Sequence, residues 1–226
     1  MHPKHCILFT KNLTHKYWFM KKFISFSLLL TFLVSGKPMF SQKAALLIPT
    51  GHSNNIGSLS FSPDDRYIFS SSNDGIKIWQ ASDYKLIKKM EDEFASAILP
   101  HPVDKNLVIL VSSKEVRFFD INRFEIVKRI ANDSIKMGDA VTSPDGRYLY
   151  VAGISKANKP SMLIWRLNLS DFSFEKVFEH FDASMYNVVC SNLSINSSGT
   201  ELLVNDHNYN SYLIDGKQRK LIKTIS

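Results

Sequence analysis

The chain has 226 residues, a formal net charge of +7 and two cysteines. Residues 1–42 carry six lysines and no acidic residue, so the remainder has 22 basic and 21 acidic residues. A nearly neutral remainder excludes nucleic-acid binding through a general basic field. Only Cys190 lies beyond residue 42, which excludes an intramolecular disulfide there. Its apolar neighbours predict a small buried side chain, not a nucleophile.

Residues 1–42 are predicted to be a signal peptide. Two lysines precede an apolar run, Phe23–Val34, which is too short to span a bilayer but has the length of a leader core. Met20 is the expected true start, because the segment beginning there is a complete leader, and cleavage is expected between residues 36 and 42. The expected location is therefore periplasmic or extracellular, with no stable membrane span. Tethering by an uncleaved leader is the alternative.

The stretch Gly51–Met90 contains four short alternating apolar runs separated by turn residues. They fall at residues 56–61, 67–69, 76–79 and 84–90. Asp74-Gly75 lies between the second and third runs and indicates a hairpin, because Asp-Gly supplies the positive φ of a tight turn. Four strands in about forty residues predict one antiparallel meander, the size of one propeller blade.

The rest of the chain repeats this unit, which predicts an all-β fold. The expected first turns of successive units contain Pro63, Pro102, Pro144 and Asn196. The expected ends of the third strands are Trp79, Phe119, Trp165 and Ile214. After a strand at Ala44–Ile48, four four-stranded antiparallel units are predicted at about 51–93, 94–132, 133–180 and 181–226.

The first unit, with GHS, SPDD and SSSNDGIKIW, resembles a WD-repeat β-propeller blade. The third, TSPDGRYLYVAG, is similar to YVTN-type bacterial propeller repeats. The resemblance covers residues 43–226 and implies β-propeller blades. It also implies a buried hydrogen-bond network, which the departures from the motif restrict to the first blade. Its members would be His52, Ser70, Asp74 and Trp79, in a structural role.

The strand count predicts an incomplete or open propeller. In the WD-type arrangement the opening strand completes the last blade, and the inner strands that should join Lys43–Pro49 are absent. We therefore expect this chain to be the N-terminal part of a longer propeller protein. A complete chain would be an open arc that associates edge to edge or requires a partner.

The leading functional hypothesis is a non-catalytic scaffold for protein–protein interaction or sensing in the periplasm or at the cell exterior. Binding is expected in loops that share one face of the propeller. The candidate residues are Lys156, Asn158, Lys159, His207 and Tyr209. The partner is a protein or peptide of unknown identity, and a longer chain could add an enzymatic domain.

No catalytic residue, metal or cofactor is predicted, because turn chemistry explains the repeated aspartates. One alternative is a propeller enzyme of the YVTN or lactonase kind. The other is a carbohydrate-binding surface module.

Overall fold

A computed structural model describes residues 51–225 except 158–160, 182–189 and 207–209. The chain divides into the units Met1–Ile48 and Pro49–Ser226, and the described residues all belong to the second. The predicted signal peptide and the predicted strand Ala44–Ile48 lie outside them. The described part of the chain contains strands and no helix, so it offers no helix able to cross a membrane.

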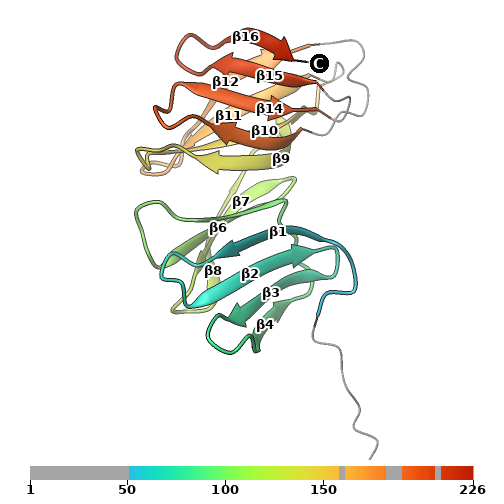
Figure 1. The fold of residues 1–226 in the computed structure, drawn as a ribbon, viewed down its shortest axis with the longest axis vertical. Helices are drawn as coiled ribbons and strands as arrows, with labels where there is room; N and C mark the ends of the chain where they lie inside the picture. Colours follow the sequence, from blue (N-terminus) through green and yellow to red (C-terminus); the bar gives the residue numbers. More distant parts are fainter. Residues whose placement is uncertain (1–50, 158–160, 182–189, 207–209, 226) are drawn as a thin grey trace, which may run out of the picture. The chain divides into compact units, whose positions relative to one another are not determined.

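Sixteen strands form four antiparallel sheets, each built from four consecutive strands (Figure 1). Blade 1 contains β1 (Ile56–Phe61), β2 (Tyr67–Ser72), β3 (Gly75–Gln80) and β4 (Leu86–Met90). Blade 2 contains β5 (Ala97–Pro100), β6 (Leu107–Val111), β7 (Glu115–Asp120) and β8 (Glu125–Ala131). Blade 3 contains β9 (Ile135–Thr142), β10 (Tyr148–Ser155), β11 (Met162–Asn168) and β12 (Phe174–His180). Blade 4 contains β13 (Ser191–Ile195), β14 (Glu201–Asn205), β15 (Ser211–Asp215) and β16 (Lys220–Ile225). The prediction of four four-stranded propeller blades is confirmed.

The turn between the first and second strands has the same hydrogen bonds in blades 1 and 3. The Ser62 hydroxyl donates to Asp64 (2.7 Å) and accepts from the backbone N–H of Tyr67 (3.0 Å). Ser143 donates to Asp145 at 2.6 Å in the corresponding place. Each carboxylate is thus engaged by its own turn, which explains why aspartate recurs after proline.

The turn between the third and fourth strands also repeats. One residue with positive φ occupies it in each blade: Tyr84, Phe124, Phe172 and Arg219. Five positions earlier, on the third strands, lie Trp79, Phe119, Leu167 and Ile214. The predicted equivalence of Trp165 with Trp79 was therefore wrong, because Trp165 pairs with Val151 two positions before Leu167. The register shift between β11 and β12 falls at Ile164/Trp165, with the extra residue on β12. The corresponding shift between β3 and β4 falls at Ile78/Trp79, two residues closer to the turn, so Trp165 lies inside a longer strand.

Three apolar cores each lie between two consecutive blades. The core between blades 1 and 2 joins Phe69 and Ile78 to Val108 and Phe119, among others. Successive side chains of a strand point to opposite faces of its sheet. In blades 2 and 3 both sets of side chains are apolar, so each of these sheets packs against a neighbouring blade on both faces.

Among the described residues, none covers one face of blade 1 in this way. Leu59 of β1 and Ile98 of β5 occupy equivalent positions in the registers of their blades. Ile98 is 4% exposed beneath blade 1, whereas Leu59 is 64% exposed. Ile56 and Phe61, also on β1, are more than half exposed.

Candidate functional site

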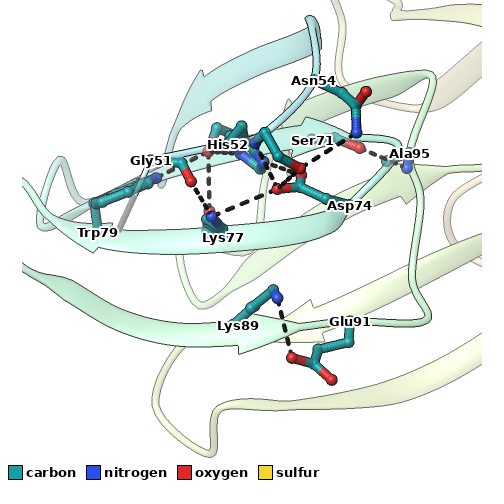
Figure 2. Close-up of polar contacts among 12 residues, drawn as sticks. Gly51, His52, Asn54, Ser71, Asp74, Lys77, Trp79, Lys89, Glu91 and Ala95 are labelled. Atoms are coloured by element: carbon teal, nitrogen blue, oxygen red, sulfur yellow. Dashed lines mark hydrogen bonds and ion pairs between the residues drawn. The ribbon is translucent and has the colours of Figure 1, made fainter. Parts of the chain in front are cut away.

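The four residues predicted to form a network in blade 1 lie together, and Figure 2 labels three of them, His52, Asp74 and Trp79. Nδ1 of His52 is 2.5 Å from Oδ1 of Asp74, and Nε2 is 2.7 Å from the hydroxyl of Ser70. The indole N–H of Trp79 donates to the same hydroxyl at 2.8 Å. Because a carboxylate only accepts, Nδ1 of His52 is the donor to Asp74. The network ties the segment before β1 to β2, β3 and the loop between them.

Two further contacts stabilise the carboxylate of Asp74. The backbone N–H of Ser53 donates to it at 2.9 Å, and the Ser53 hydroxyl lies at 3.2 Å. The Ser53 N–H, followed by His52, lowers the pKa of Asp74 well below its usual range. The side chain of His52 is 3% exposed and that of Asp74 is 17% exposed, so the pair is partly withdrawn from solvent. Such a partly buried, hydrogen-bonded cluster supports a structural role.

Lys77 also belongs to this cluster, although this was not predicted from the sequence. Its ammonium donates to the Gly51 carbonyl at 2.6 Å and lies 3.6 Å from Asp74 (Figure 2). In blade 2 the equivalent residue is Arg117, which is 1% exposed and donates to the Phe94 carbonyl. Both cations therefore anchor the segment that enters their blade. The sequence contained a sign of this burial. Lys77 lies two residues before Trp79, and Arg117 lies two residues before Phe119, so each cation is on the same face of its strand as an apolar side chain.

Arg117 lies beside a hollow of about 560 Å³ at one edge of blade 2. The segments around it are residues 92–94, 112–115 and 131–133, which join neighbouring strands or blades. We call this edge, together with residues 72–75 and 155–157, the loop face. The walls of the hollow are charged: Glu93 pairs with Arg117 and Arg129, and Glu115 also pairs with Arg129. Burial, together with the charge of Arg129, lowers the pKa of Arg117 to about 10.

The predicted partner-binding residues fall on this side of the chain where the structure describes them. Lys156 is exposed, and its backbone N–H donates to the Ser134 carbonyl at 3.1 Å, which links the loop after β10 to the segment before β9. The other four predicted residues lie outside the described residues: Asn158, Lys159, His207 and Tyr209.

Cys190 lies at the start of blade 4 and is 1% exposed. Its thiol donates to the Gly153 carbonyl at 3.3 Å. Burial, with a contribution from Asp206, raises the thiol pKa to about 12, which suppresses the nucleophilic thiolate. Within the described ranges no three His, Cys, Asp or Glu side chains are grouped closely enough to hold a metal ion.

Residues 44–80 match the family model described as WD domain, G-beta repeat. The chain is 30% identical over 109 residues to WD repeat-containing protein 3 of Mus musculus and 28% identical over 109 residues to WD repeat-containing protein 3 of Homo sapiens. Each alignment covers 48% of this chain but only 12% of the relative's length.

A solved structure is also similar in fold. A chain of the Kuenenia stuttgartiensis hydrazine synthase superimposes with a TM-score of 0.53 at 15% identity, covering 70% of this chain and 52% of that one. At this identity the likeness concerns the fold alone.

Proposed function

We propose that this chain of four β-propeller blades, whose residues 44–80 match the WD-repeat model, is a non-catalytic scaffold that binds a protein or peptide partner outside the cytoplasm. The loop face supports this proposal most directly. Its segments are held on hydrogen-bonded sheets, and those at residues 92–94, 112–115 and 131–133 line a hollow with charged walls. A rigid framework that presents variable loops is a common basis for recognition.

The arrangement of charge on the loop face supports binding over catalysis. Glu93, Glu115 and Arg129 form a paired cluster, so none of them is left as a free acid or base. Such fixed charge pairs favour orientation and partner choice. Lys114 and Lys156 are exposed on the same face and are available for contact.

Photocrosslinking tests this role. A benzoyl-phenylalanine residue replaces Lys114 or Lys156 in the native host, and Val127 serves as a control because it is exposed on the outer strand β8. Discrete adducts from the two loop-face positions, without adducts from Val127, are expected. The same adduct pattern from all three positions, or no adduct from any, would contradict the proposal.

Export forms part of the same proposal and rests on residues 1–42. Two lysines followed by the apolar run Phe23–Val34 are typical of a leader. Fusing residues 1–42 to alkaline phosphatase, which becomes active only after export, should give active enzyme. Replacing two leucines of the run by aspartate should abolish that activity, and unchanged activity would argue against an export signal.

Self-association is supported by one observation, the apolar surface of β1. Ile56, Leu59 and Phe61 are 54%, 64% and 55% exposed. We propose that this surface contacts a second copy of the chain. Sedimentation velocity should show dimers that disappear in the variant Leu59→Glu with Phe61→Glu. A wild-type chain that stays monomeric at about 100 μM would refute this contact.

A further inference from the structure

Three hollows follow one another on the edge of the blades opposite the loop face. We call this edge the turn face. It consists of the turns between first and second strands, at 62–66, 101–106, 143–147 and 196–200, and between third and fourth strands, at 81–85, 121–124, 169–173 and 216–219. The hollows measure about 510, 440 and 630 Å³ and lie between blades 1 and 2, 2 and 3, and 3 and 4.

Shared walls make the three hollows consecutive. His101 lines the first and second, and Tyr148 lines the second and third. The turns themselves touch: Gly146 has a φ of +72°, and a Cβ there would lie 3.2 Å from the Val103 side chain. One extended ligand could therefore contact all three hollows without leaving the turn face.

The charge of the three walls is unbalanced. Their basic residues are Lys105, Arg147, Arg166, Lys217 and Arg219. Their acidic residues are Asp65 and Asp145, which leaves an excess of three positive charges. Glu175, outside the walls, pairs with two of the arginines and reduces the excess to two. The loop-face hollow has the opposite balance, with four acidic and three basic residues.

The third hollow holds its arginines in place. Arg166 donates from Nε to Glu175 at 2.7 Å, and Arg219 pairs with the other oxygen of the same carboxylate. The guanidinium of Arg166 also lies over the ring of Tyr148, 4.6 Å from its centre. Because the two arginines are fixed before any ligand arrives, little side-chain entropy is lost when they bind a carboxylate.

The same walls carry groups that suit a polypeptide. Pro63, Pro102 and Pro144 lie in successive turns, with Tyr148 and the backbone of Gly199 beside them. Tyrosine and arginine are enriched in protein interfaces. A polyanion held mainly by charge would need a stronger field than an excess of two or three, whereas a peptide also uses the apolar walls.

We propose that the turn face binds an extended acidic peptide segment, whose carboxylates contact the basic residues of successive hollows. This inference rests on the proposed role as a protein-binding scaffold but concerns a different surface. Loop-face binding and turn-face binding can therefore fail separately.

The test uses the whole 226-residue chain and a fluorescein-labelled peptide of twelve alternating glutamate and serine residues. Lys105→Glu with Lys217→Glu reverses one exposed charge in the first hollow and one in the third. The matched control, Lys89→Glu with Lys223→Glu, makes the same change at exposed positions of the outer strands β4 and β16, outside both faces. Fluorescence anisotropy at about 50 mM salt measures the Kd, because low salt preserves exposed charge interactions.

The wild-type chain and the outer-strand variant should bind the peptide with Kd values within twofold of each other. The turn-face variant should bind at least about tenfold more weakly, since two attractions become repulsions. If the turn-face variant melts at a lower temperature than wild type, Lys105→Gln with Lys217→Gln replaces it, and a loss of about threefold or more is expected.

Three results would overturn the proposal. Equal losses in both charge-reversed variants would indicate a general charge effect. Equally tight binding of an alternating lysine–serine peptide would exclude recognition of acidic groups. Tighter binding of a labelled twelve-nucleotide oligothymidylate would replace the peptide with a nucleic acid as the ligand.

Discussion

A matched pair of alanine substitutions tests how the blades stack. Ile98 and Leu59 are equivalent in register, but Ile98 is 4% exposed and Leu59 is 64% exposed. Ile98→Ala removes three carbon groups from the core between blades 1 and 2, worth about 0.8 kcal/mol each, or about 2.4 kcal/mol together. The cavity left behind raises the expected cost to about 2–5 kcal/mol. Leu59→Ala should change the free energy of unfolding by about 0.5 kcal/mol or less.

Urea denaturation followed by circular dichroism measures both values. The protein concentration is varied in parallel, so that a contribution from self-association through Leu59 shows as concentration dependence. Similar costs for the two variants at low concentration would refute the inference that only Ile98 is covered by a neighbouring blade.

Three more predictions concern polar groups of the blade 1 network and of the loop-face hollow. His52→Ala removes one hydrogen bond to the Asp74 carboxylate and one to Ser70, so the free energy of unfolding, measured by urea denaturation, should fall by about 2–4 kcal/mol. A fall of less than about 0.5 kcal/mol would refute a stabilising role for the network. The pKa of Asp74 is lower in the folded chain than its ordinary value of 3.8, so its stabilisation is complete above about pH 4 and is lost as the pH falls through the folded pKa. Wild type should therefore lose stability more steeply than Asp74→Asn between pH 5 and 3, and parallel pH profiles would contradict this. Arg117→Met leaves Glu93 with one cation instead of two, so the free energy of unfolding should fall by about 1–3 kcal/mol. Adding Glu93→Gln to this variant should recover part of the loss. A further, additive loss in the double variant would show that the pairing of Glu93 with Arg117 does not stabilise the fold.

The sequence predicted the blades well because strand period and turn residues are local signals. The Pro-Asp turns and the alternating apolar runs each specify one hairpin without reference to the rest of the chain. The same locality explains the error at Trp165. A tryptophan after two apolar residues has the appearance of a strand end, but the length of β11 depends on its pairing with β10.

The site was predicted only in part. His52, Ser70, Asp74 and Trp79 lie together, and a shared motif suggested them. Lys77 was missed, because a lysine in a strand usually points to solvent. Its contacts with the Gly51 carbonyl and with Asp74, which make its burial favourable, form only in the folded chain. Charges that collect on the turn face come from four blades, and no single stretch of sequence shows that they meet.

Hydrogen–deuterium exchange, resolved by peptide fragments, tests the four-blade architecture most directly. The second and third strands of every blade are hydrogen-bonded on both sides, so β2, β3, β6, β7, β10, β11, β14 and β15 should exchange slowly. The outer strands β4, β8, β12 and β16 should exchange faster in each blade. Slow exchange confined to one or two blades, or protection of an outer strand above its inner neighbours, would contradict four equivalent stacked sheets.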